Sequence, residues 1–136
     1  MQHEIVNDYD SAGNDDAFAP AQAAYADYLG NVNPAPYREG VNYYATQYGD
    51  AAFFVMDTRA YRSPNEAEDD EHKTMLGQSQ KEDLFKWAAK VNQTVTWKFV
   101  VSSVPLHSLY SHGDDTWAGF LNERDQVMDV LETVDK

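Results

Sequence analysis

Hydrophobic and polar positions along the chain follow two different periods, which predict strands and helices in turn. Residues 43–48 and 51–56 are two apolar and aromatic runs separated by Gly49-Asp50, a pair typical of a tight hairpin turn. The second run is nearly continuous in apolar residues, so we expect both faces of that strand to be covered. Residues 94–102 form the clearest strand, because β-branched and aromatic side chains run through its length.

Three helices are predicted from apolar residues at helical spacing. The first is expected to begin at Pro20, whose missing N–H has no intrahelical partner in a first turn, and to end at Gly30. Ser79 and Glu82 have the spacing of a capping box at the start of the second. The apolar faces of the second and third helices comprise Leu84, Trp87, Ala88 and Val91, and Phe120, Arg124, Val127 and Leu131.

Strands therefore alternate with helices, which favours an α/β layered architecture whose chemistry lies in loops at strand ends. A chain of 136 residues suits one domain or part of one. We expect five large aromatic side chains in its core. They are Phe53, Phe54, Trp87, Trp97 and Phe99.

The strongly negative charge of the chain disfavours partners that are themselves negatively charged. Acidic residues outnumber basic ones 23 to 10, and a formal charge of −13 repels nucleic acid and anionic lipid, so nucleic acid is not expected as a stable partner. A small phosphorylated substrate remains compatible with this charge if metal ions or arginines reverse the field locally. No apolar run reaches the ~18 residues that a membrane span requires.

Two arginines follow the strand over residues 51–56. Arg59 and Arg62 flank Tyr61, and two guanidinium groups at the carboxyl end of a strand are suited to clamping a phosphate group. The alternative is that they pair with the acidic loop over residues 63–73, which itself is expected to be solvated.

Residues 3–8 bring together an imidazole and hard oxygen donors, the ligand types of divalent and trivalent cations. Asn and Asp clusters more often form turns and caps, so both interpretations stay open on composition alone. His107 and His112 lie in a polar loop and are candidate ligands or acid–base groups, although loop histidines are more often ordinary surface residues.

Several stretches, in this order and spacing, resemble the PhoD-like phosphatase family over essentially the whole chain. They are residues 3–8, 56–63, 73–80, 97–105 and 115–120, followed by Glu123-Arg124. The resemblance implies a calcineurin-like metallophosphoesterase fold, in which two β-sheets are sandwiched between helices with a metal centre at the strand ends. It also implies hydrolysis of phosphate mono- or diesters, with calcium and, in some members, iron, and a secreted parent protein.

The resemblance also assigns roles to individual residues. Asn7 resembles a metal-liganding amide, with Asp8 beside it as a second candidate ligand, and His3 resembles a catalytic group near the metal or substrate. Arg59 and Arg62 match an element expected to contact the substrate phosphate or to support the wall of the active site.

Departures from the family pattern limit what the chain is expected to do alone. Met1 and Gln2 stand where family members have two aspartates, and the chain stops before a later Gly-Asp-x-His type element. We therefore expect residues 1–136 to be the central part of a PhoD-like metallophosphatase domain, with an incomplete fold and little or no activity in isolation. The alternative is a non-catalytic phosphate-binding or structural remnant of the same fold.

Overall fold

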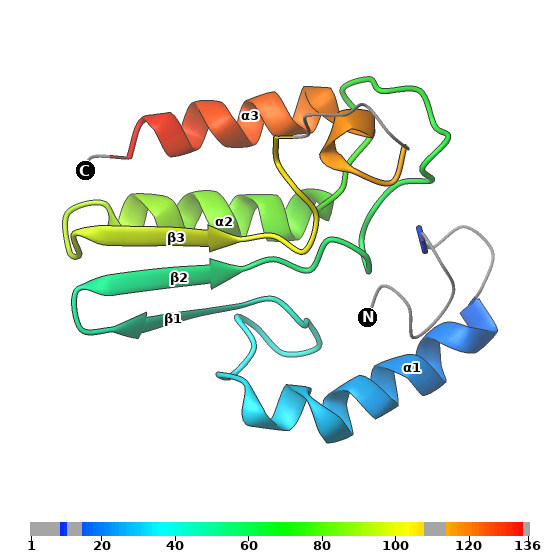
Figure 1. Cartoon of the computed structure of the whole chain (residues 1–136), viewed down its shortest axis with the longest axis horizontal. Coiled ribbons are helices and arrows are strands. Elements are labelled where there is room, and N and C mark those ends of the chain that lie inside the picture. Colours follow the sequence, from blue (N-terminus) through cyan, green and yellow to red (C-terminus); the bar gives the residue numbers. More distant parts are fainter. Residues whose placement is uncertain (1–8, 11–14, 108–113, 135–136) are drawn as a thin grey trace.

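The computed structural model describes residues 9–10, 15–107 and 114–134 as a small sheet with helices beside it (Figure 1). In chain order the elements are α1 (Asp15–Tyr28), the 3-10 helix η1 (Gly30–Val32), β1 (Tyr44–Tyr48), β2 (Ala51–Val55), α2 (Gly77–Val91), β3 (Trp97–Val101), the 3-10 helix η2 (Trp117–Gly119) and α3 (Leu121–Glu132). The alternation of strands and helices confirms the layered α/β prediction. In the described part of the chain, no helix is long and apolar enough to cross a membrane.

The three strands form one sheet in the order β1-β2-β3. β1 and β2 are antiparallel and joined by the predicted hairpin, where Gly49 adopts the left-handed φ of 56° that this turn requires. β2 and β3 are parallel, with Val55 opposite Val101, while Tyr44 at the start of β1 pairs with Val55. The carboxyl ends of β2 and β3 therefore meet the amino end of β1 at one edge of the sheet.

The core lies between the sheet and α2. Phe54 on β2 is fully buried and its ring lies 5.6 Å from that of Trp87 on α2. α3 packs along α2 and adds Val127 to the same cluster. This confirms the predicted apolar face of the second helix and, for Phe120, Val127 and the partly buried Leu131, that of the third. The core extends through Tyr43, Met56, Met75, Leu76, Leu84, Val104 and Trp117.

The opposite face of the sheet corrects two expectations. Burial alternates along β2, so this strand is covered on one face and not on both. Trp97 and Phe99 on β3, predicted to be core, are 62% and 44% exposed, and Phe53 is only partly buried in a stack 4.9 Å from Phe99. The reason is that α2 and α3 lie on the other face of the sheet (Figure 1), while α1 reaches this face beside Tyr44 and Val55. The second sheet of the expected sandwich is not among the described elements.

Two helices begin earlier than their sequence signals indicate. α1 starts at Asp15, so Pro20 lies inside the helix. α2 starts at Gly77, two residues before Ser79, and its N-cap residue, Leu76, makes no side-chain capping hydrogen bond. The predicted capping box of Ser79 and Glu82 is therefore not at the start of this helix. Gly77 has a φ of 69°, and an added Cβ would lie 2.9 Å from the Cβ of Tyr61, so glycine is required there.

Glu123 on α3 holds the chain at the start of α2. Its buried carboxylate accepts hydrogen bonds from the Thr74 hydroxyl (2.5 Å) and from the backbone N–H groups of Met75 (2.6 Å) and Leu76 (3.1 Å). Lys81 lies 3.5 Å from the same carboxylate. The sequence pattern predicts that the neighbouring Arg124 lies on the buried face of this helix. In the structure Glu123 is buried instead, and Arg124 is partly exposed.

The acidic loop over residues 63–73 is exposed at all five of its carboxylates, as predicted. Two of them still have structural contacts. Asp69 accepts hydrogen bonds from the backbone N–H groups of Leu121 and Asn122 at the start of α3, and Asp70 accepts from those of His72 and Lys73. The loop therefore caps α3 while its charge stays in solvent.

Asp83 on α2 gives the fold a defined dependence on pH. Its buried carboxylate accepts hydrogen bonds from Tyr43 Oη (2.8 Å) and from Arg38 Nη2. Burial alone would raise the pKa of Asp83, but the hydrogen bonds from Arg38 and Tyr43 outweigh it and hold the pKa below its usual value. This stabilisation is present above the pKa of about 3.9 in the unfolded chain and is lost as the pH falls through the lower folded value.

For Asp83→Asn we therefore expect a loss of unfolding free energy that is largest near neutral pH and shrinks in acid. Urea unfolding of both chains across this pH range measures the difference directly. Asp129→Asn, at an exposed position of α3, is the control and is expected to follow the unmodified chain. A difference for Asp83→Asn that stays constant down to acid pH would contradict the assignment.

Candidate functional site

A cavity of about 200 Å³ lies at the edge where the strand ends meet. The loop after β2 contributes Asp57, Thr58 and Arg59, and Ser103 follows β3. The other wall comes from the start of β1 and from α1, through Asn42, Tyr44 and Tyr25. The carboxyl ends of parallel strands are where layered α/β folds place their ligands.

The backbone of Asp57 is fixed from α2. The Gln80 side chain accepts a hydrogen bond from Asp57 N (2.8 Å) and donates one to Asp57 O (2.8 Å), so it pairs with the end of β2 much as another strand would. The Asp57 carboxylate accepts from the backbone N–H groups of Arg59 and Ala60 and from Asn42 Nδ2. The turn that carries Arg59 is thus held on both sides.

Two hydroxyl groups lie at the same edge. Thr58 Oγ1 and Ser103 Oγ are 2.6 Å apart, and Ser103 is exposed to the cavity. The neighbouring Ser102 donates to Val104 O and accepts from Trp117 Nε1. Because Ser102 is engaged in this way, it does not resemble an activated nucleophile.

Arg59 lies between the cavity and the segment at residues 9–10. Its Nη1 donates to Tyr9 O (3.2 Å) and its Nη2 to Asp115 Oδ2 (3.1 Å), while Nε is buried without an acceptor among the described residues. The residue is 3% exposed and is one of those that line the cavity. Two of its five donors are used, which leaves donors for an anion.

Arg62 stands behind Arg59 and does not line the cavity. It donates to Thr58 O (2.7 Å), Asn65 Oδ1 (2.9 Å) and Asp115 O (2.9 Å), and its guanidinium lies over the Phe120 ring. Burial, followed by the charge of Arg59, lowers the pKa of Arg62 to about 10, so it remains charged at neutral pH. These contacts suit a residue that supports the wall of the site.

The charges around the cavity are close to balance. The Arg59 guanidinium pairs with the carboxylate of Asp115, and the charges of Asp115, Asp10 and Asp57 all act on Arg62. A doubly negative phosphate group would therefore need a further cation beside Arg59.

Several predicted site residues fall outside the described part of the chain, namely His3, Asn7, Asp8 and His112. Tyr9, which follows Asp8 directly in the sequence, is buried and contacts Arg59. His107 is exposed and does not line the cavity. Within the described ranges there is no group of three or more His, Asp or Glu side chains that could hold a metal ion.

Sequence reasoning missed Tyr25, Asn42, Tyr44 and Gln80. Asn42 precedes the first strand of the hairpin, and the hairpin register itself brings that end beside the carboxyl end of β2. The hairpin pattern alone therefore predicts that Asn42 lies near the end of β2, whereas Tyr25 and Gln80 reach the site through tertiary packing.

The fold and the cavity together define a layered α/β segment with a polar cavity at its strand ends. The sequence model of the PhoD-like phosphatase family matches residues 2–136, so the chain belongs to that family. Its fold is similar to a solved structure described as "Structure of PhoD", with a TM-score of 0.75 and 22% sequence identity. The similarity covers 96% of this chain and 30% of that chain. A search of curated proteins found no match.

Proposed function

We propose that this chain forms the phosphate-binding strand edge of a metal-dependent phosphoric ester hydrolase that acts on small phosphate mono- or diesters. The observation that carries the proposal is Arg59, a buried residue that lines the strand-end cavity and whose guanidinium group has an Nε–H without an acceptor among the described residues. Family membership supports a phosphatase as the parent activity. Arg62 is proposed as the positioning residue that keeps the Thr58–Arg59 turn and Asp115 in place.

The residues proposed to bind the metal ion lie outside the described part of the chain. The described residues do not form a metal centre, and the carboxylate of Asp57 in the cavity is already engaged in hydrogen bonds. The proposed ligands are Asn7 and Asp8, for Ca²⁺ and, as in some family members, Fe³⁺, and His3 is the proposed catalytic group. Asn7 and Asp8 directly precede Tyr9 in the sequence, and the Tyr9 carbonyl accepts a hydrogen bond from Arg59. This connection supports the proposal of a metal ion near Arg59. Such an ion supplies the extra positive charge and polarises phosphoryl oxygens when bound.

Phenyl phosphate is expected to protect the chain from urea unfolding, and more so with Ca²⁺ present. At a ligand concentration about tenfold above the dissociation constant the gain is about 1.4 kcal/mol. In Arg59→Gln we expect this increment to vanish. Comparing each variant with and without ligand separates binding from any loss of stability that the substitution itself causes.

Arg124→Gln is the control, because Arg124 is a partly exposed arginine on α3 that pairs with the neighbouring Asp125. It should retain the full increment. Protection that persists in Arg59→Gln would refute the role of this arginine. The same samples are expected to release little or no phosphate, and turnover like that of an intact phosphatase would show that the chain alone is sufficient.

A further inference from the structure

A pair of hydroxyl groups joins the ends of β2 and β3 at the strand-end cavity. The two strands are parallel and pair as far as Val55 and Val101, and Met56 N continues the ladder by donating to Val101 O (3.0 Å). Beyond this point Thr58 and Ser103 lie side by side, with their side-chain oxygens 2.6 Å apart. That distance is within the range of an O–H···O hydrogen bond, so one hydroxyl donates to the other.

Burial determines which of the two hydroxyls is the donor. Thr58 is 1% exposed, and within the described ranges its hydroxyl has Ser103 as its one hydrogen-bond partner. If Ser103 donated, the Thr58 proton would be buried without an acceptor, an arrangement that folded proteins avoid. Thr58 therefore donates and Ser103 Oγ accepts. The proton of the exposed Ser103 is left for another partner.

Ser103 and Arg59 line the same cavity from adjacent strand ends. Arg59 follows β2 and has a buried Nε–H without an acceptor among the described residues. Ser103 follows β3 and has the free O–H. A phosphoryl group carries several acceptor oxygens, so it can accept hydrogen bonds from an arginine and a hydroxyl at once.

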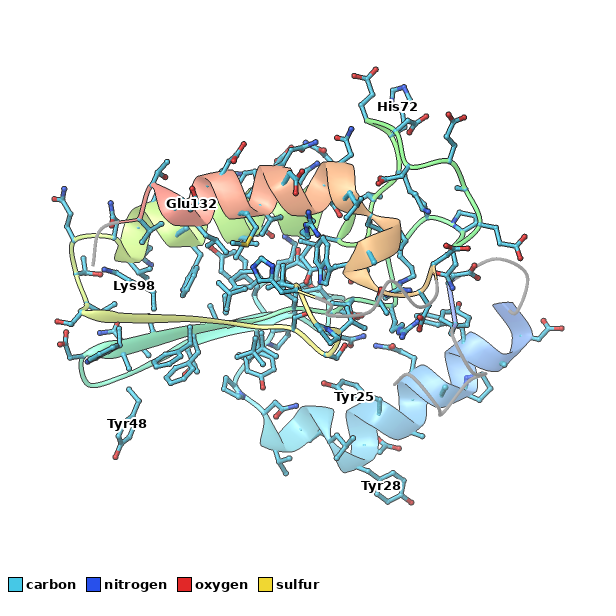
Figure 2. The ribbon with its side chains drawn as sticks, turned by 45° about the horizontal axis from the view of Figure 1, so that its top comes forward. Tyr25, Tyr28, Tyr48, His72, Lys98 and Glu132 are labelled. Carbon is cyan, nitrogen blue, oxygen red and sulfur yellow. The ribbon has the colours of Figure 1, made fainter. Side chains whose placement is uncertain are left out.

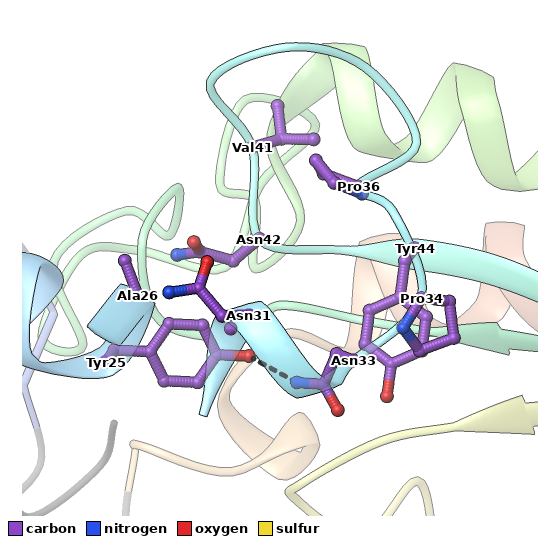
Figure 3. Close-up of a pocket in the computed structure, with 10 residues that line it drawn as sticks. Tyr25, Ala26, Asn31, Asn33, Pro34, Pro36, Val41, Asn42 and Tyr44 are labelled. Carbon is purple, nitrogen blue, oxygen red and sulfur yellow. Dashed lines mark hydrogen bonds between the residues drawn. The ribbon is translucent and has the colours of Figure 1, made fainter. Parts of the chain in front are cut away.

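The other wall of the cavity holds polar side chains that are already engaged. Both hydrogens of the Asn42 carboxamide are used, because its Nδ2 donates to Gln22 Oε1 (3.1 Å) and to Asp57 Oδ2 (3.1 Å). The Tyr25 hydroxyl points toward Asn33 and accepts a hydrogen bond from its Nδ2 at 3.4 Å (Figure 3). We therefore expect an anion in this cavity to depend on donors from the strand ends.

We propose that Ser103 Oγ donates a hydrogen bond to the substrate phosphoryl group beside Arg59, and that Thr58 is the positioning residue that directs the Ser103 proton toward it. This inference rests on the proposed function, because it places the phosphoryl group in the strand-end cavity. The buried Thr58 hydroxyl occupies one lone pair of Ser103 Oγ and so restricts the rotation of the Ser103 hydroxyl. Among the described residues no histidine or carboxylate hydrogen-bonds Ser103, so its role is binding and not nucleophilic attack.

The test is an NMR titration of the chain with inorganic phosphate in the presence of Ca²⁺. Ser103→Ala is expected to raise the dissociation constant about tenfold, because it removes a hydrogen bond to a charged group. Thr58→Val keeps the shape of threonine and should raise it about threefold. Thr58→Ser keeps the hydroxyl and should restore the original value. Ser79→Ala, at an exposed position of α2, is the control and should bind like the unmodified chain.

The double variant, with Thr58→Val and Ser103→Ala together, separates contact from positioning. If Thr58 acts through Ser103, its substitution adds nothing once the Ser103 hydroxyl is gone. Losses that multiply in the double variant would overturn the positioning role of Thr58. Unchanged binding in Ser103→Ala, with binding lost in Arg59→Gln, would overturn this inference and leave the proposed function intact. Failure of the unmodified chain to bind phosphate would overturn both.

Discussion

Glu123→Ala is expected to cost about 3–5 kcal/mol of unfolding free energy, because it leaves buried donors without an acceptor. The carboxylate serves the Thr74 hydroxyl and the N–H groups of Met75 and Leu76 at once, and it lies 1% exposed between α2 and α3. Its loss would also leave Lys81 without its buried counter-charge. Urea unfolding at neutral pH measures the cost.

Glu132→Ala is the matched control, since Glu132 is an exposed glutamate near the other end of α3 (Figure 2). A substitution there should change stability by less than about 0.5 kcal/mol. If the two variants unfold at similar urea concentrations, the carboxylate of Glu123 does not hold the start of α2 as described.

Gln80→Leu is expected to cost about 2–5 kcal/mol, because leucine keeps the volume but leaves Asp57 N and Asp57 O unpaired in the interior. The same change frees the turn that carries Arg59. We therefore expect a loss of phosphate binding that accompanies the loss of stability, measured by urea unfolding with and without phenyl phosphate.

Gln78→Leu provides the comparison for this prediction. Gln78 lies on the same helix two residues earlier, is exposed, and donates a hydrogen bond to Glu82. Both its stability and its ligand-induced increment should resemble those of the unmodified chain. Full phosphate protection in Gln80→Leu would contradict the view that Gln80 positions the site.

The hairpin and the strand ends were predictable because their signals are local. Gly49-Asp50 between two apolar runs specifies the turn, and the turn fixes the register that places Asp57 and Arg59 at one edge. Burial was less predictable, since Trp97 and Phe99 have the composition of a core strand whether or not another layer covers them. Periodicity within one segment carries no information on which neighbour packs against it.

The same limit applies to the site. Arg59 and Arg62 were identified from their position after a strand, and the structure places them in one cluster. It could not be foreseen that Asp115, distant in the sequence, would bond to both arginines, or that Glu123 and Gln80 would be buried polar residues. Such pairings join elements that meet only in the folded chain.

Mapping of phosphate binding by two-dimensional NMR on the isotopically labelled chain tests the central claim most directly. With Ca²⁺ present, phenyl phosphate should shift the backbone signals of Asp57, Thr58, Arg59 and Ser103 at the strand-end cavity, and Arg59→Gln should abolish these shifts. Shifts confined to another surface, or none at all, would contradict the assignment of this edge as the phosphate site.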